Sequence, residues 1–300
     1  MKGKALYRGG KLCLDAGAQS SLRPFFGGHI HANGDAALRV PAPRARPVSF
    51  VPFRIESFAQ THEGRVRDHN EDSFCAKEAQ GLWAVADGMG GHEGGEWASG
   101  RIVAALDAIA LPDDFDEAQR LIAEAIERAN IIILAEARVR SKQMGSTVVT
   151  LLVQGTRYAV QWVGDSRAYV LRDGELIQLS RDHSQVQEMV DRGIMKPEDA
   201  VNHPMGHILS RAVGVREEAG VDGVAGEIIP GDIFLLCSDG LHGYVQAGDI
   251  RRLLARGSPQ RASADLVALT LENGAPDNVT VIAVSASEAT ILNLPDSVNA

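Results

Sequence analysis

Apolar residues recur at the two-residue period of β-strands along much of the chain from residue 53 onward. Alternating or continuous apolar runs rich in β-branched residues predict strands at 54–61, 73–78, 82–87, 147–153, 158–164, 168–172, 175–179, 232–239 and 279–285. Turn-forming pairs, Gly155-Thr156 and Asp173-Gly174, separate neighbouring runs and predict tight hairpins. The strands are therefore expected to pair mainly antiparallel.

Apolar residues at helical spacing interrupt these strands. They predict long helices at 93–110 and 116–141, a polar helical segment at 181–214, and two further helices at 249–256 and 260–273. Helices that follow and separate antiparallel runs favour an α+β fold, in which two antiparallel sheets pack face to face with helices outside them. We expect one domain over residues 53–286, which is within the usual size range.

The two ends of the chain carry weaker patterns. Residues 1–52 combine glycine pairs and several prolines with eight Lys or Arg and only two Asp. We expect a poorly ordered or accessory extension there, with a short strand or hairpin at 36–40. Residues 287–300 are expected to form a C-terminal tail.

Charge and cysteine content narrow the class of function. The net charge is −9 despite the basic extension, so the main body is acidic, which disfavours a nucleic-acid partner and suits a site that collects metal cations. Cys13, Cys75 and Cys237 are odd in number and far apart, as expected of a cytoplasmic protein without disulfides. We find no secretory signal and no apolar stretch of the ~18 residues that a membrane span requires.

Five short acidic islands are the candidate chemistry, and four of them lie at the edge of an apolar run. A strand that ends in Asp-Gly points a carboxylate from its tip while the glycine lets the backbone turn. Several such tips would form an all-oxygen site suited to Mg²⁺ or Mn²⁺, although a single Asp-Gly is typical of a simple turn. The islands are Arg67-Asp68-His69-Asn70-Glu71-Asp72, Asp87-Gly88-Met89-Gly90-Gly91, Gly164-Asp165-Ser166-Arg167, Ser238-Asp239-Gly240 and Asp277-Asn278.

Three of these aspartates, Asp87, Asp239 and Asp277, are the candidate metal ligands because each lies beside a strand end and a small or turn-forming residue. Two hard cations about 3.5–4 Å apart need a bridging carboxylate. Asp87 suits that role, since Gly88 also lets a backbone carbonyl approach a metal. Asp165 has two interpretations: a turn residue beside a paired Arg167, or a ligand of a weaker third ion.

The first island carries the candidate catalytic side chains. Arg67 has a planar guanidinium suited to bidentate contact with a phosphate, although a surface salt bridge to Asp68 or Glu71 is the alternative. Glu71 and Asp72 are expected to accept hydrogen bonds from metal-bound water and so to orient it.

A set of short motifs resembles the bacterial branch of the PP2C (PPM) metal-dependent serine/threonine phosphatases. The motifs occur in that family's order over about residues 53–286. They are Arg67-x-x-x-Glu71-Asp72, Asp87-Gly88-Met89-Gly90-Gly91-His92, Gly145-Ser146-Thr147, Gly164-Asp165-Ser166-Arg167, Ser238-Asp239-Gly240 and Asp277-Asn278-Val279-Thr280.

This resemblance implies an αββα sandwich with a two-metal site in the cleft between the sheet ends. It implies that Asp87 bridges both metals, that the carbonyl of Gly88 binds one, and that Asp239 and Asp277 complete the other. It further implies that Asp165, with Asp239, holds a loosely bound third ion. Residues 181–214 are similar to the family's mobile flap beside the active site.

One position departs from many eukaryotic members, which have a histidine directly after the Asp-Gly as the proposed general acid. Here that position is Met89, which cannot donate a proton. Another group must then supply it, either a metal-bound water or another histidine. The histidines available are His62, His69, His92, His183, His203, His207 and His242.

The leading hypothesis is hydrolysis of phosphoserine and phosphothreonine in proteins by a water that two cations activate. The expected partners are a bacterial Ser/Thr kinase and its substrates, and the protein is expected to act as a monomer. No cysteine nucleophile is needed. Two alternatives are a hydrolase of small phosphoesters and a non-catalytic relative that binds phosphoproteins.

Overall fold

The computed structural model describes residues 53–91, 93–200 and 203–288. The expected extension over residues 1–52, its strand at 36–40, His92 and residues 289–300 of the tail lie outside these ranges.

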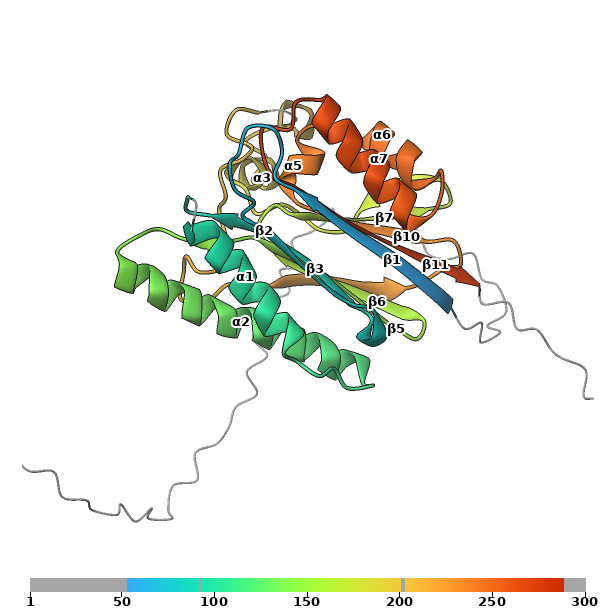
Figure 1. The fold of residues 1–300 in the computed structure, drawn as a ribbon, viewed down its shortest axis with the longest axis horizontal. Coiled ribbons are helices and arrows are strands. Elements are labelled where there is room, and N and C mark those ends of the chain that lie inside the picture. Colours follow the sequence, from blue (N-terminus) through green and yellow to red (C-terminus); the bar gives the residue numbers. More distant parts are fainter. Residues whose placement is uncertain (1–52, 92, 201–202, 289–300) are drawn as a thin grey trace, which may run out of the picture. The chain divides into compact units, whose positions relative to one another are not determined.

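Two antiparallel sheets form the centre of the fold (Figure 1). The order of the five-stranded sheet is β1 (Phe53–His62), β11 (Val279–Glu288), β10 (Ile233–Cys237), β7 (Arg167–Arg172) and β8 (Glu175–Gln178). The order of the second sheet is β2 (Asp72–Lys77), β3 (Leu82–Met89), β5 (Val148–Gln154), β6 (Arg157–Val163) and β9 (Asp222–Glu227), with the short β4 (Gly145–Ser146) paired to β3.

Helices cover the outer face of each sheet (Figure 1). On the second sheet these are α1 (Glu93–Asp107) and α2 (Phe115–Arg140), and on the first sheet α5 (Asp239–His242), α6 (Ala247–Leu254) and α7 (Pro259–Glu272). A short 3-10 turn, η1 (Glu78–Gln80), precedes β3. The αββα sandwich expected from the motifs is confirmed.

Three apolar layers hold the sandwich together. One lies between α1, α2 and the second sheet, one between the two sheets, and one between the first sheet and α5–α7. Trp83 and Phe234, from opposite sheets, are fully buried in the middle layer. Because burial of apolar surface is the main favourable contribution to folding, these layers fix the sheet ends that carry the acidic islands.

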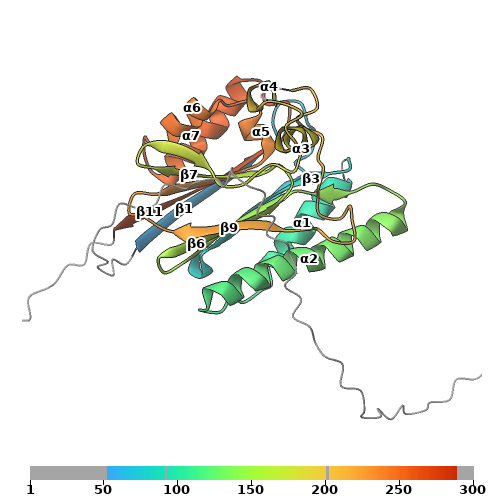
Figure 2. The ribbon, with the colours of Figure 1, turned by 180° about the vertical axis from the view of Figure 1, so that it is seen from behind.

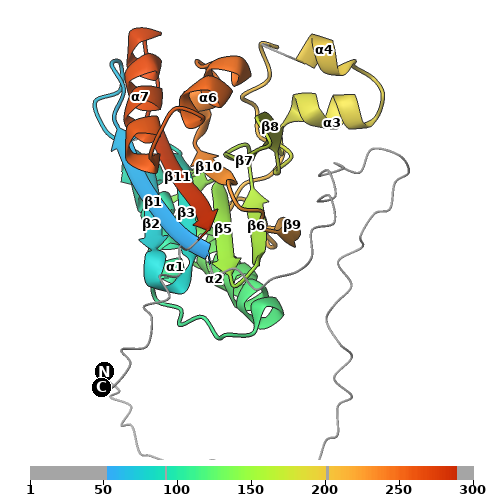
Figure 3. The same cartoon turned by 90° about the vertical axis from the view of Figure 1, so that its right-hand side faces the viewer.

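The segment expected to be helical at 181–214 is mostly irregular. Of its described residues, only those of α3 (Gln185–Asp191) and α4 (Pro197–Ala200) are helical, and both helices project beyond the sheets (Figures 2 and 3). Ser184 caps α3 by accepting a hydrogen bond from the Gln187 amide at 3.2 Å. The helix ends before Gly193, whose φ of +68° does not fit a helix.

Strand β9 was not predicted from the sequence. Its residues, Asp-Gly-Val-Ala-Gly-Glu, include two glycines and one β-branched residue, a composition that is poor in strand formers. It pairs with β6 along its whole length. Gly226 faces the ring of Tyr158, where a Cβ would lie 2.9 Å from the ring carbons, so packing rather than propensity selects glycine there.

Among the described helices, none combines the length and apolar composition that crossing a lipid bilayer requires.

Candidate metal centre

Two of the predicted acidic residues lie directly opposite each other at the same end of the second sheet. Asp72, the first residue of β2, pairs in register with Asp87, near the end of β3. Like charges at directly opposed positions destabilise a sheet. A cation or a shared proton is therefore needed to keep both carboxyl groups there.

Two further carboxyl groups approach this pair from other elements. Asp239 follows β10 at the start of α5, and its carboxyl lies within hydrogen-bonding reach of Asp87. Asp165 lies in the turn between β6 and β7 and is 6% exposed. Burial, and after it the charge of Asp239, raises the pKa of Asp165, so these two carboxyl groups lie near each other as well.

Close backbone contacts bring the loops of the islands together. A Cβ on Gly240 would lie 1.8 Å from the carbonyl oxygen of Asn278, and a Cβ on Gly88 would lie 2.2 Å from that of Gly95 in α1. The glycines in the Asp-Gly pairs are thus required by close approach of a second chain segment, not by turn geometry alone.

Asn278, in the loop before β11, is hydrogen-bonded at three points to the loop between β1 and β2, a role that the sequence analysis did not assign. Its Oδ1 accepts a hydrogen bond from the Glu71 amide at 2.8 Å. Its Nδ2 donates to the carbonyl oxygens of Glu63 and His69, both at 2.9 Å. The signal available in the sequence was its place beside Asp277, since asparagine commonly satisfies backbone groups in loops.

Ser146 and Thr147 hold the backbone of Asp87. Ser146 Oγ donates to the Asp87 carbonyl at 2.8 Å, and Thr147 Oγ1 accepts from the Asp87 amide at 3.1 Å. Thr147 Oγ1 also lies 2.6 Å from Ser166 Oγ, in the turn that carries Asp165. The Gly-Ser-Thr motif therefore fixes one candidate ligand and links it to another.

Asp72 is the most constrained of the acidic groups. Ser238 Oγ donates to its Oδ2 at 2.8 Å, whereas its Oδ1 is buried without a hydrogen-bond partner. Burial raises the pKa of Asp72 to about 7, although hydrogen bonds from Thr280 and Ser238 lower it in part. A buried acceptor without a partner costs free energy, which indicates that this oxygen faces a site for a further donor or cation.

Mutual repulsion acts on the other carboxyl groups too. Burial and the charge of Asp72 hold the pKa of Asp87 well above its ordinary value. Burial and the charge of Asp239 do the same for Asp165, and burial and Asp277 raise the pKa of Asp239. Clusters of acids with raised pKa values are typical of functional sites.

Arg67 pairs with Asp277, a contact that neither sequence-based interpretation of Arg67 anticipated. The two atoms Arg67 Nη2 and Asp277 Oδ2 are 2.8 Å apart, with 53% and 35% of the side chains exposed. This hydrogen bond and the charge of Asp277 raise the pKa of Arg67. The candidate phosphate-binding side chain is therefore anchored beside the candidate metal ligands.

The chemistry of these residues fits hard divalent cations. All the converging groups are oxygen donors, one buried carboxylate oxygen lacks a partner, and the carboxyl groups repel one another. In the arrangement shown by the described residues, however, no three acidic, histidine or cysteine side chains lie close enough together to hold an ion between them. To bind cations together, these side chains would have to move closer to one another, and Asp277 would have to turn from Arg67 toward the cation.

Glu71 lies beside this cluster, with its carboxylate against the first turn of α1. A Cβ on Gly95 would lie 2.6 Å from Glu71 Oε2. The predicted site residues Arg67, Glu71, Asp72, Asp87, Gly88, Asp165, Asp239 and Asp277 thus share one end of the sandwich.

The pKa values of His242, Cys75 and Cys237 do not favour a catalytic role for these three side chains. His242 Nε2 lies 3.0 Å from the Asp165 carbonyl oxygen, and burial lowers the pKa of His242 to about 4. Burial raises the pKa of Cys75 to about 11 and of Cys237 to about 12. Thiols that stay protonated are poor nucleophiles, in agreement with a mechanism that uses no cysteine.

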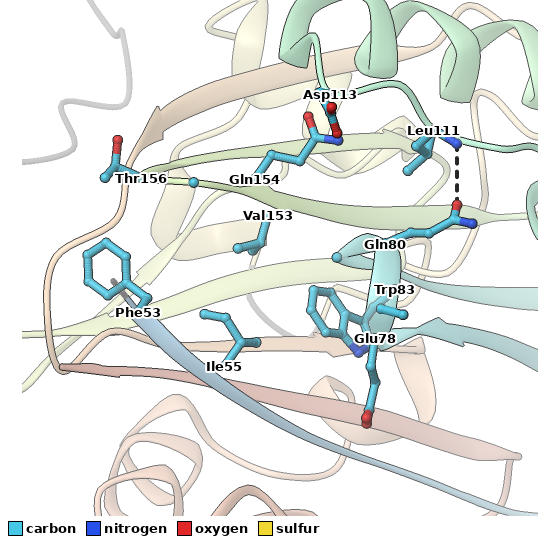
Figure 4. A pocket seen from close by; sticks show the side chains of 13 residues that line it. Phe53, Ile55, Glu78, Gln80, Trp83, Leu111, Asp113, Val153, Gln154 and Thr156 are labelled. Carbon is cyan, nitrogen blue, oxygen red and sulfur yellow. Dashed lines mark hydrogen bonds between the residues drawn. The ribbon is translucent and has the colours of Figure 1, made fainter. Parts of the chain in front are cut away.

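A cavity of about 540 Å³, whose lining residues are drawn in Figure 4, lies where β1 and β3 begin, at the opposite end of these strands from the acidic residues. Phe53, Ile55, Trp83 and Val153 form its apolar part, where β1 and β3 begin rather than end. Neither histidine nor cysteine lines it. The carboxylate cluster, rather than this cavity, is therefore the candidate site.

Comparison with known proteins decides the family. The model of the family Protein phosphatase 2C matches residues 53–189. The serine/threonine phosphatase stp of Listeria innocua is 36% identical over 237 residues, which cover 75% of this chain and 93% of the Listeria protein. The chain belongs to the protein phosphatase 2C family.

Similarity to further proteins agrees with the assignment. The serine/threonine protein phosphatase PstP of Mycobacterium tuberculosis is 38% identical over 77% of this chain, although the chain spans only 45% of PstP. The solved catalytic domain of PstP, in complex with two manganese ions, has a TM-score of 0.68 at 35% identity and covers 78% of this chain and 99% of that one. PppA, a regulatory component of the T6SS in Pseudomonas aeruginosa, has a TM-score of 0.73 at 38% identity, covering 79% and 99%.

Proposed function

We propose that this chain hydrolyses phosphoserine and phosphothreonine in proteins, using two bound divalent cations, Mn²⁺ or Mg²⁺. The observation that carries the proposal is the convergence of Asp72, Asp87, Asp165 and Asp239 at one end of the sandwich, with a guanidinium beside them. The names of the relatives and the manganese-bound neighbour support the same reaction.

Each residue has a distinct task in this proposal. Asp87, the Gly88 carbonyl, Asp239 and Asp277 would hold two cations, and Asp165 with Asp239 a third. When bound, such cations supply Lewis acidity that brings the pKa of water near neutrality.

Arg67 would bind the phosphoryl oxygens, because a guanidinium matches their geometry with two parallel hydrogen bonds. Its pairing with Asp277 holds it at the edge of the site before substrate arrives. Glu71 and Asp72 would accept hydrogen bonds from water and orient it toward phosphorus. With Met89 in place of histidine, the leaving alcohol would take its proton from water.

The physiological role that follows is reversal of a bacterial Ser/Thr kinase. The kinase, its substrates, the monomeric state and the cytoplasmic location stay predictions.

The deciding experiment is turnover of a phosphothreonine peptide with Mn²⁺, in excess chelator, and after Mn²⁺ is restored. We expect activity, complete loss, and recovery. Full activity in excess chelator would exclude the metal-dependent reaction. A nucleotide and a sugar phosphate are measured in parallel, since faster turnover of either would favour the small-molecule hydrolase. Absence of turnover with metal bound would favour the non-catalytic relative.

A further inference from the structure

His183, a buried side chain outside the acidic islands, binds both backbone groups of one glycine. Its amide donates to the carbonyl oxygen of Gly164 at 2.9 Å, and its ring Nδ1 accepts from the Gly164 amide at 3.1 Å. Gly164 precedes Asp165 and has a φ of +106°, a conformation that L residues with a side chain rarely adopt. The imidazole thus restricts the backbone conformation of Gly164, the residue with the greatest conformational freedom in the turn that carries Asp165.

The hydrogen bonds of His183 fix its tautomer. Because Nδ1 accepts from Gly164, the ring hydrogen of a neutral imidazole lies on Nε2. Nε2 lies 2.9 Å from Asp222 Oδ2 and can donate to it. Arg211 Nη1 lies 3.2 Å from the same oxygen and donates to the Gly220 carbonyl at 2.7 Å. Asp222 is the first residue of β9, so this edge strand orients the ring.

The same residues close the base of the flap. Here the two ends of the flap pair with each other. Ser184 forms an isolated antiparallel β-bridge with Leu209, and the Ser210 amide donates a hydrogen bond to the His183 carbonyl oxygen at 2.9 Å. Trp162 of β6 stacks on the imidazole with ring centres 6.2 Å apart, and its Nε1 donates to the Arg181 carbonyl at 2.7 Å. The neck of the flap, residues 181–184 and 209–211, is therefore attached to the turn that carries Asp165.

We propose that His183 is a positioning residue: by accepting from the Gly164 amide, it holds the Asp165 carboxylate where an additional divalent cation binds, and it links that position to the flap neck. This inference rests on the proposed function, because Asp165 serves as a ligand only if the acidic cluster binds cations. Residues that orient a ligand commonly affect metal affinity by about 10–100-fold when they are replaced.

Two substitutions separate the two hydrogen bonds of the ring. In His183→Asn, the amide oxygen occupies the place of Nδ1 and can still accept from Gly164, whereas the contact with Asp222 is lost. In His183→Gln, the terminal amide reaches the place of Nε2 and can still contact Asp222, whereas the acceptor for Gly164 is lost. Both variants remove the aromatic ring, so loss of packing is matched between them.

The measurement is a Mn²⁺ titration of the full chain, followed by electron paramagnetic resonance of free Mn²⁺, together with wild type and Asp165→Asn. We expect Asp165→Asn to lose the weakest ion and His183→Gln to bind it at least about tenfold more weakly. His183→Asn should bind it within about threefold of wild type, because its acceptor is retained. The double variant Asp165→Asn/His183→Gln should bind Mn²⁺ no more weakly than Asp165→Asn alone.

Three results would overturn the inference in distinguishable ways. Equal losses in His183→Gln and His183→Asn would show that the ring acts through packing only. A full complement of ions in His183→Gln, with one ion missing in Asp165→Asn, would show that His183 does not position Asp165. A full complement in Asp165→Asn would remove the ligand role of Asp165, and no Mn²⁺ bound by wild type would refute the proposed function itself.

Discussion

At the scale of single residues, the pair between Arg67 and Asp277 joins substrate binding to metal binding. We expect Arg67→Ala to lower kcat/KM for a phosphopeptide by about 10–150-fold, since a charge-assisted bidentate contact is worth roughly 1.5–3 kcal/mol. Affinity for Mn²⁺ should not fall, because the substitution removes a cation beside the acidic cluster. Steady-state kinetics and a metal titration check both statements.

A matched control is Arg54→Ala, which removes another exposed arginine of an ion pair, with Glu56, on β1. Its kcat/KM should equal that of wild type. An unchanged kcat/KM in Arg67→Ala would mean that Arg67 is only a partner of Asp277.

Repulsion within the carboxylate cluster leads to a second prediction. Asp239→Asn removes one negative charge from a buried group of acids. Without metal, the variant should therefore melt about 2–4 °C higher than wild type, which corresponds to about 1 kcal/mol for a domain of this size. With Mn²⁺ the order should reverse, because wild type gains binding energy that the variant lacks. Calorimetry in chelator and in Mn²⁺ measures both.

An exposed acid far from the cluster provides the reference for this experiment. Asp113→Asn, at the cavity of Figure 4, should leave both melting temperatures near those of wild type. A lower melting temperature of Asp239→Asn in chelator would show that hydrogen bonding, not repulsion, dominates at that position.

The acidic residues could be identified from the sequence because a carboxylate and a turn-forming residue stand next to each other in short motifs. Asp87 and Asp239 lie beside apolar strands whose ends are visible in the pattern. The pairing of Arg67 with Asp277 could not be identified, since 210 positions separate the two residues. Nor could the contacts of Asn278 be identified, because they depend on how the loop before β11 meets the loop between β1 and β2.

At the scale of elements, the neck of the flap separates its outer part from the metal centre. Replacing residues 185–205 by a Gly/Ser linker removes α3 and α4 but keeps the contacts of His183 and Ser210. We expect turnover of a small aryl phosphate to stay within about tenfold of wild type, and turnover of a phosphothreonine protein to fall considerably more, because remote contacts are lost. Both substrates are measured on one preparation, with bound metal quantified.

Equal losses on the two substrates would instead mean that α3 and α4 support the metal centre. The control is a linker of the same kind in place of the β7–β8 turn, at Asp173-Gly174. It tests whether replacement of any loop lowers activity, and we expect it to leave turnover of both the aryl phosphate and the phosphothreonine protein unchanged.

Regular strands were the most predictable elements, and β9 and the flap the least. Strands β3, β5 and β10 are mostly apolar and largely buried on both faces, so their sequences carry a strong signal. Edge strand β9 is held by pairing with β6, and the flap is divided by Gly193 and Pro197. Tertiary contacts decide such segments more than local preference does.

At the scale of the whole molecule, residues 53–288 by themselves supply both sheets, their covering helices and three apolar layers. We therefore expect deletion of residues 1–52 to leave the melting temperature within about 2 °C of the full chain and turnover of an aryl phosphate unchanged. A loss of more than 5 °C, which is about 1.3–2.5 kcal/mol for this size, would show that the basic extension packs against the domain. Scanning calorimetry of both chains is sufficient.

Strands β1 and β11 pair antiparallel from Phe53↔Glu288 to His62↔Val279. The chain thus enters and leaves the domain at neighbouring positions, one strand length of about 33 Å from the acidic end. A short peptide could join these two positions, and new ends could be opened at an exposed hairpin such as Gly155-Thr156. The domain is consequently suited to circular permutation and to insertion into the loop of a host protein, with its reactive end facing away from the host.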